Sequence, residues 1–127
     1  MLCNLPDVGL IRFSGDDAQT FLHNQLTCDV AALAPGRSIY GAYCNPKGRV
    51  LATFLLWPTA DAFFMQLPAA LREPIQKTLS RFILRAKVRV DDVSGEWAML
   101  GASGSDAEQV AQRAAGQAPA EIHQVSL

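Results

Sequence analysis

Residues 25–57 read QLTCDVAALAPGRSIYGAYCNPKGRVLATFLLW, and this stretch decides the fold. Its second half predicts a β-hairpin around the turn Asn45-Pro46-Lys47-Gly48. Proline presets φ at the second position of such a turn, and glycine accepts the left-handed conformation that is usual at the fourth. We therefore predict paired strands over residues 38–45 and 49–57. The second strand has apolar residues on both faces, which is typical of a central strand that is covered on both sides.

Helices and strands alternate around this hairpin. The predicted elements are, in chain order, a strand over residues 9–13, a helix over 17–27, the two hairpin strands, a third strand over 62–67, a helix over 69–84 with a buried stripe that includes Phe82, strands over 87–93 and 96–101, and a last helix that Ser105 caps and Gly116 ends. Asp16 is the predicted cap of the first helix. The last helix should face inward through Ala107, Val110, Ala111 and Ala114. The order β-α-β-β-β-α-β-β-α predicts the α+β class with a mostly antiparallel sheet.

Length and composition describe one domain. The chain has 127 residues, of which 50% are hydrophobic, so it can form a core of its own. We expect that domain over residues 1–116 and a flexible tail over 117–127, where no pattern remains. No apolar run could span a membrane, and no signal peptide is evident. Three cysteines at no metal-like spacing fit a reducing cytosol, so we expect a cytoplasmic protein with neither a metal site nor a membrane partner.

The charged residues are unevenly distributed along the chain. The net charge of −1 argues against a dedicated nucleic-acid binder. Basic residues nevertheless gather in one stretch, as Arg72, Lys77, Arg81, Arg85, Lys87 and Arg89. This pattern fits a solvated helix face followed by an exposed strand face. It also fits an anion patch that faces RNA, a phosphate or a polyglutamyl tail.

Three segments together carry a family resemblance. They are FSGDDAQTFLHNQLTCDV (residues 13–30), which ends in Gln-x-Thr-x-Asp, the hairpin YCNPKGRVLATFLL (43–56), and LSRFILRAKVRV (79–90). In this order they resemble the opening strand and helix, the central hairpin and the helix-to-strand junction of folate-binding YgfZ-type proteins. These proteins are relatives of aminomethyltransferase, the T-protein of glycine cleavage. The resemblance covers most of the chain up to about residue 104.

The resemblance implies one β/α unit of the aminomethyltransferase folate-binding fold, with tetrahydrofolate as the ligand. The residues that it implies for the site are the apolar Tyr43, Leu51, Met65 and Leu67, the polar Thr53 and Gln66, and Asp29 at the border of the cavity. Pterins are flat and bind between apolar walls with few polar contacts. Core packing is the alternative for at least half of the apolar and polar positions. For Asp29 the alternative is a turn residue that binds backbone amides.

Two departures from the family pattern affect the expected activity. Aminomethyltransferases carry an acidic pair just after the hairpin glycine; those positions fall near Leu51 and Ala52, and no acid occurs over residues 46–60. Proton handling needs a titratable group within reach, so this absence favours a unit that is not catalytic alone. Family members are also typically more than twice as long, and their Lys-Gly-Cys-Tyr-x-Gly-Gln-Glu signature is missing. The chain is thus expected to be an N-terminal portion.

Three functions remain open at this point. The resemblance implies a folate-binding domain linked to iron–sulfur cluster assembly or repair and to tRNA modification. The first alternative is an aminomethyltransferase domain that transfers a one-carbon unit to tetrahydrofolate. The second is a non-catalytic module that contacts tRNA or iron–sulfur proteins through the six basic residues named above. The apolar excess over residues 49–67 also suggests a homodimer through an exposed sheet edge.

Overall fold

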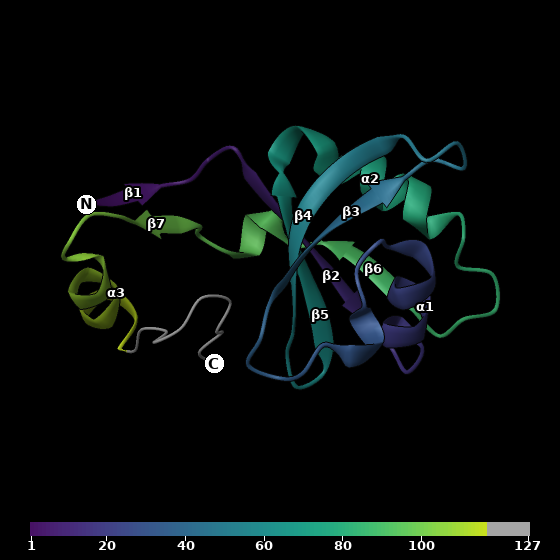
Figure 1. Cartoon of the computed structure of the whole chain (residues 1–127), viewed down its shortest axis with the longest axis horizontal. Helices are drawn as coiled ribbons and strands as arrows, with labels where there is room; N and C mark the ends of the chain where they lie inside the picture. The colour runs from purple at the N-terminus through teal and green to yellow at the C-terminus, as the bar shows by residue number, and fades with distance from the viewer. Residues whose placement is uncertain (117–127) are drawn as a thin grey trace.

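A five-stranded antiparallel sheet organises the computed structural model, which describes residues 1–116 (Figure 1). The strand order is β3-β4-β5-β2-β6. The strands are β2 (Val8–Ser14), β3 (Ile39–Cys44), β4 (Val50–Pro58), β5 (Ala62–Pro68) and β6 (Arg89–Asp92). The prediction of the α+β class with a mostly antiparallel sheet is confirmed. The flexible tail predicted for residues 117–127 lies outside the described residues.

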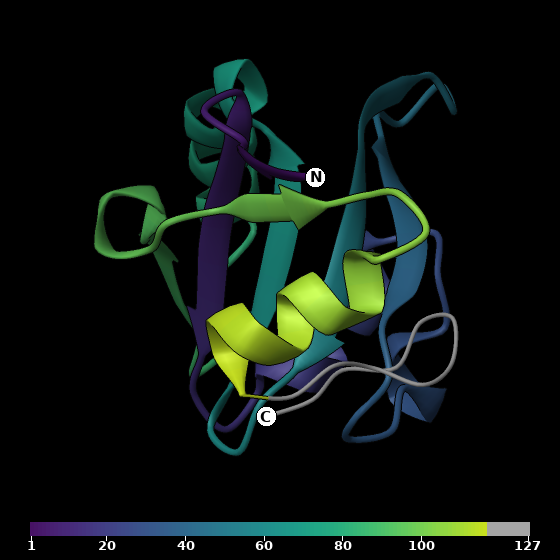
Figure 2. The same cartoon turned by 90° about the vertical axis from the view of Figure 1, so that its left-hand side faces the viewer.

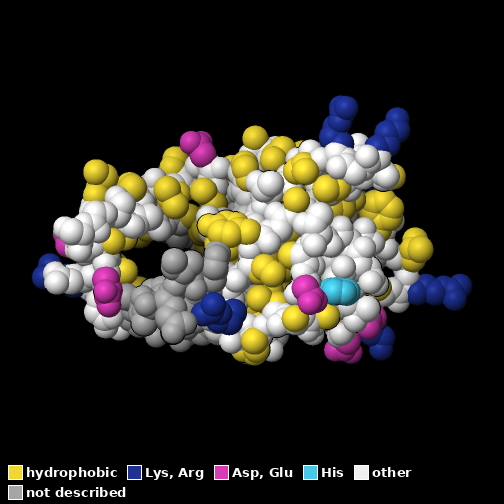
Figure 3. Space-filling view, in the orientation of Figure 1, with side chains coloured by type: hydrophobic (Ala, Val, Ile, Leu, Met, Phe, Trp, Pro, Cys, Tyr) yellow, Lys and Arg dark blue, Asp and Glu magenta, His cyan; other side chains and the backbone are white. Residues whose placement is uncertain are grey.

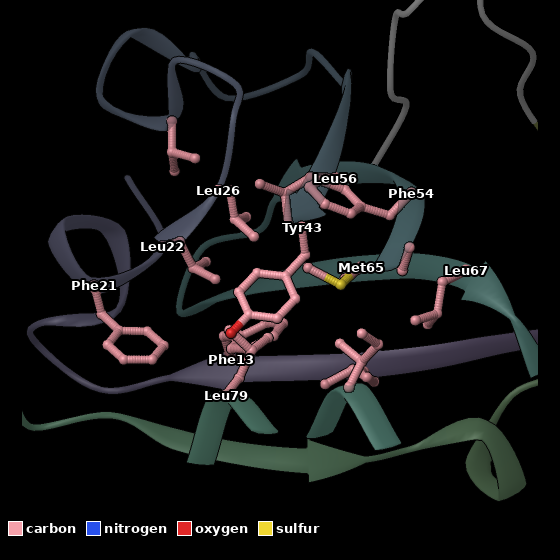
Figure 4. Close-up of a cluster of buried hydrophobic side chains, with 14 of the residues drawn as sticks. Phe13, Phe21, Leu22, Leu26, Tyr43, Phe54, Leu56, Met65, Leu67 and Leu79 are labelled. Carbon is pink, nitrogen blue, oxygen red and sulfur yellow. The ribbon is translucent and has the colours of Figure 1, made fainter. Parts of the chain in front are cut away.

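Two helices cover one face of this sheet. They are α1 (Ala18–Gln25) and α2 (Arg72–Ser80), and the short 3-10 turns η1 (Val30–Ala32) and η2 (Ala69–Leu71) lie next to them in the chain. Phe21 and Leu22 of α1 and Leu79 of α2 pack against the inward side chains of the central strands. The core therefore lies between the helices and the inner face of the sheet (Figure 4).

An arm projects from the opposite side of the sheet. Strand β1 (Leu2–Asn4) pairs with β7 (Leu100–Ala102), and α3 (Ala107–Ala115) follows. The 3-10 turn η3 (Ser94–Glu96) leads from β6 into this arm. Figures 1 and 2 show β7 and α3 in front of the outer face, away from α1 and α2. No residue of α3 is fully buried in the described structure, but Ala107, Val110 and Ala111 on its predicted inward side are half-buried, whereas Ala114 is exposed.

The hairpin forms as the turn chemistry predicts. The Asn45 Oδ1 atom accepts hydrogen bonds from the backbone amides of Lys47 (3.0 Å) and Arg49 (2.9 Å). The Gly48 amide donates to the Asn45 carbonyl at 2.9 Å, and Gly48 has a φ of +80°. Only the expectation that β4 is covered on both faces is wrong. Its inner face is buried, but on the outer face Leu51 is 41% exposed.

Helix boundaries differ from the predictions at three places. Helix α2 ends at Ser80, where the Ser80 hydroxyl donates to the Gln76 carbonyl (2.7 Å), and Phe82, placed in the buried stripe, is 50% exposed. The N-cap positions are Asp17 and Asp106 rather than Asp16 and Ser105, and neither side chain makes a capping bond. The Asp17 carboxylate instead accepts the Lys87 amide at 2.7 Å, which ties α1 to the start of β6. None of the described helices is both long and apolar enough to cross a membrane.

Candidate functional site

An open depression lies on the outer face of the sheet, on the side opposite α1 and α2. Its volume is about 540 Å³. Figure 3 shows exposed hydrophobic side chains over the middle of the molecule in that view. The residues that line the depression are Asp7, Val8, Thr27, Tyr40, Gly41, Ala42, Thr53, Phe54, Leu55, Gln66, Leu67 and Pro68.

Strand register explains why the polar residues of the depression lie together. Leu55 of β4 is the neighbour of Tyr40 on β3 and of Gln66 on β5. Thr53 precedes Leu55 by two residues, and alternate residues of a strand share a face. Thr53 and Gln66 are therefore on the outer face with Tyr40 and Leu55. The result is an apolar floor that carries a hydroxyl and an amide, which can accept and donate hydrogen bonds.

Only some of the predicted site residues reach this depression. Thr53 and Gln66 line it, and Leu67 borders it, although Leu67 is 3% exposed and belongs to the core cluster on the inner face. Leu51 is on the same outer face but does not belong to the lining. Tyr43 and Met65, which are 5% and 0% exposed, belong instead to the core beneath the sheet, with Tyr43 among the core side chains of Figure 4. Burial also raises the pKa of the Tyr43 hydroxyl. The structure does not bring these two side chains to the depression, and a folate contact by them stays a prediction.

The Asp29 side chain binds a backbone amide in this structure. Its Oδ1 atom accepts the Ala32 amide at 3.2 Å and so caps η1. The same oxygen lies 3.5 Å from Nδ1 of His23, which itself accepts the Ala31 amide at 3.2 Å. This is the arrangement of the turn alternative. Asp29 does not line the depression, and its place at a folate cavity stays a prediction.

Asp7, Thr27 and Tyr40 line the depression although the sequence did not point to them. Thr27 belongs to the Gln-x-Thr-x-Asp motif, and its Oγ1 atom accepts the Ala42 amide at 2.9 Å. Strand alternation could have suggested Tyr40 once the outer face was known. Asp7 precedes β2, far in sequence from the hairpin, and it is the only charged residue of the lining.

The basic stretch divides into neutralised and unpaired side chains. Arg72, Lys77 and Arg89 each form an ion pair, with Asp92 (3.1 Å), Glu73 (2.8 Å) and Asp91 (3.0 Å) respectively. Arg81, Arg85 and Lys87 lie on the connection from α2 to β6, and their side chains form no ion pair within residues 1–116. Leu84, in the middle of that connection, is 87% exposed. The predicted anion patch is therefore reduced to this one loop.

The three cysteines are free in the structure. Cys3 is exposed, whereas Cys28 and Cys44 are half-buried. Burial, together with the neighbouring Asp29 carboxylate, raises the pKa of the Cys28 thiol. Among residues 1–116, no group of three or more His, Cys, Asp or Glu residues could hold a metal ion.

Comparison with known proteins assigns the domain to a family. The GCVT N-terminal domain family matches residues 1–126. The chain belongs to this family. The tRNA-modifying protein YgfZ of Photobacterium profundum is 34% identical over 113 residues, which are 88% of this chain and 33% of that protein. The mitochondrial iron–sulfur cluster assembly factor IBA57 homolog of Cryptococcus neoformans is 34% identical over 108 residues, which are 83% of this chain and 28% of that protein.

Solved structures contain the same fold. The glycine cleavage system aminomethyltransferase T from Bartonella henselae superposes with a TM-score of 0.77 at 23% identity, over 97% of this chain and 34% of that one. This GCVT N-terminal domain thus spans about a third of the length of the relatives that it matches. Its hairpin carries no acidic residue over residues 46–60, and Asp7 is the only residue with a carboxylate among those that line the depression.

Proposed function

We propose that this GCVT N-terminal domain is a cytoplasmic folate-binding unit that is not catalytic alone. It would serve iron–sulfur cluster assembly or tRNA modification as part of a longer protein. The observation that carries the proposal is the depression on the outer face of the sheet, where Thr53 and Gln66 lie among apolar walls. The names of the YgfZ and IBA57 relatives support the biological role.

The size and chemistry of the depression suit a tetrahydrofolate ring. Its volume of about 540 Å³ lies within the range of about 300–1,000 Å³ that is common for small-molecule sites. Tyr40 offers an aromatic ring and Leu55 an apolar side chain, while Thr53 and Gln66 offer a hydroxyl and an amide for the edges of a heterocycle. A few polar groups in an apolar site fix orientation, and the apolar area supplies affinity.

Calorimetric titration with 5-formyltetrahydrofolate tests the proposal. We expect saturable binding in the micromolar range, weakened about tenfold in Gln66→Leu because a buried polar contact is then lost. Gln109→Leu is the matched control, since Gln109 is exposed on α3 and does not line the depression. No heat at millimolar ligand would refute folate binding by this chain.

Aminomethyl transfer to tetrahydrofolate is the competing enzymatic function. The hairpin positions Leu51 and Ala52 have no acidic side chain that could move a proton. We therefore expect no transfer of a one-carbon unit by this chain, measured spectroscopically with tetrahydrofolate and an aminomethylated donor. Turnover above that of an Asp7→Asn variant would show that the remaining carboxylate suffices, and the non-catalytic proposal would be wrong.

A partner surface on the connection from α2 to β6 is the second candidate. Arg81, Arg85 and Lys87 lack ion pairs within residues 1–116 and flank the exposed Leu84, which suits an anionic partner such as tRNA or an acidic iron–sulfur protein. We expect a tRNA transcript to bind with steep salt dependence, and Arg81→Glu/Arg85→Glu to abolish binding. Lys77→Glu is the control, since Lys77 already pairs with Glu73. Equal binding by both variants would exclude this surface.

Self-association through a sheet edge also remains a proposal. One residue on each edge is already engaged: Thr27 binds the amide and the carbonyl of Ala42 on β3, and the Gln76 side chain binds the Val90 carbonyl on β6. Pairing with a second copy along the full edge would have to replace the hydrogen bonds at Ala42 or at Val90. Light scattering decides the matter, since a monomer at high concentration would rule the dimer out.

A further inference from the structure

We infer that Asp7 is the residue that fixes the ligand in the outer-face depression, and that the ligand presents a pair of N–H donors to it. The aminopyrimidine edge of a pterin is such a donor pair. This inference rests on the proposed function, because it assumes that a folate occupies the depression. It adds the residue that selects the ring and the direction in which the ligand lies.

The backbone holds Asp7 at one end of the depression. Its carbonyl accepts the Ala69 amide at 2.7 Å, and the next residue, Val8, pairs with Pro68 of β5. The position is thus anchored between β2 and the start of η2. The Asp7 carboxylate makes no hydrogen bond and no ion pair within residues 1–116, so its acceptor oxygens are available to a ligand.

Charge separates Asp7 from the rest of the lining. A carboxylate only accepts hydrogen bonds, and its two oxygens match two parallel N–H groups. Thr53, Gln66, Thr27 and Tyr40 carry hydroxyl or amide groups, which both donate and accept, so they discriminate less between ligands. Asp7 therefore favours a ligand that presents adjacent N–H donors, and the aminopyrimidine edge of a pterin meets this requirement.

The same charge determines how a folate would lie. Its glutamyl carboxylates would be repelled by Asp7, whereas the aminopyrimidine ring is attracted by charge-assisted hydrogen bonds. The ring therefore binds at the Asp7 end, and the glutamyl tail points away from it. In this arrangement the start of β2 supplies the carboxylate that the hairpin lacks near Leu51 and Ala52.

A comparison of two variants with two ligands tests the inference. Asp7→Asn keeps the shape of the side chain but removes the charge. Asp16→Asn is the matched control, because Asp16 is exposed, does not line this depression, and lies beyond the opposite end of β2. The ligands for calorimetry are 5-formyltetrahydrofolate and an analogue without the 2-amino group. Thermal unfolding should give the same midpoint for both variants and the parent chain.

We expect Asp7→Asn to bind 5-formyltetrahydrofolate about 10- to 100-fold more weakly than the parent, and Asp16→Asn to bind like the parent. The parent should lose a similar factor with the analogue, and Asp7→Asn should lose little more, because the two changes remove one contact. If the parent chain binds 5-formyltetrahydrofolate and Asp7→Asn binds it with the same affinity, the inference is overturned but folate binding stands. No binding by the parent would refute the proposed function, and the inference with it.

Discussion

Replacement of Gly41 by alanine should destabilise the domain, although a glycine-to-alanine change in a strand usually stabilises it. Gly41 lies in β3 opposite Phe54. A Cβ atom at this position would lie 2.7 Å from Sγ of Cys28 and 2.8 Å from two ring atoms of Phe54. The Phe54 ring is buried in the core, so it cannot move aside.

The magnitude follows from two opposing contributions. Gly41 does not have a positive φ, so alanine there would ordinarily stabilise a strand by about 0.5–1 kcal/mol. Overpacking of a well-filled core costs about 1–3 kcal/mol. Three contacts below 3 Å, two of them with a buried ring, place this site in the upper part of that range. We therefore expect a net loss of about 1–2 kcal/mol in the free energy of unfolding.

Urea unfolding of Gly41→Ala and Gly95→Ala measures this effect. Gly95 is the control because its added Cβ would meet no atom within 4 Å and its φ is not positive. Gly95→Ala should match or slightly exceed the parent in stability. If Gly41→Ala proved as stable as Gly95→Ala, the segment that carries Cys28 could not pack against β3 as the structure has it.

Three further predictions concern the core, the hairpin and the buried thiol. Met65→Ala should lower the free energy of unfolding by about 2–5 kcal/mol, since the side chain is fully buried; a loss below 1 kcal/mol in urea unfolding would contradict its core position. Asn45→Ala should lower the free energy of unfolding by about 1 kcal/mol in the same assay, because two turn amides lose their acceptor. Lys47→Ala should change it little, and an equal loss in the two variants would contradict the role of the Asn45 side chain. Because burial raises the pKa of Cys28, its alkylation, followed by peptide mass spectrometry, should lag behind that of Cys3 and need a higher pH. The raised pKa favours the neutral thiol in the fold, so the stability that Cys28 contributes should be lost as pH rises above the ordinary thiol value. Reaction of both thiols at one rate would contradict this prediction.

The fold was predictable where the determinants are local. The hairpin depends on Asn45 and Gly48, which set the turn through their own side-chain and backbone preferences. The end of α2 was not predictable, because the apolar spacing continues through Phe82 while the backbone turns at Ser80. The coverage of β4 was misjudged for a related reason. Apolar residues on both faces indicate that both faces are sites of contact, but not which contact each face makes.

The candidate site was predictable in part. Alternation identifies Thr53 and Gln66 as residues of shared faces, but the sequence does not say on which face the helices dock. Once α1 and α2 cover the inner face, Tyr43 and Met65 become core residues and the alternate positions of the strands line the depression. Asp7 could not be found in this way. It reaches the site only because β2 pairs with β5, a long-range contact that no local pattern encodes.

Exposed aromatic surface extends the argument for function at the outer face. Trp57 and Phe64 stack there with ring centroids 6.0 Å apart, and Trp97 contacts Phe64 edge-on at 5.8 Å. Trp97 is 56% exposed, and Trp57 and Phe64 are half-buried. Burial of the apolar surface that they leave in water would lower the free energy, which makes this aromatic patch a candidate interaction site. The longer relatives share only about a third of their length with this chain, so either a ligand or another polypeptide surface could bury the patch. Both tryptophans of the chain lie in this cluster, so quenching of their fluorescence by 5-formyltetrahydrofolate would indicate a ligand that extends from the depression onto the patch. Folate binding without quenching would leave the aromatic cluster for a protein surface.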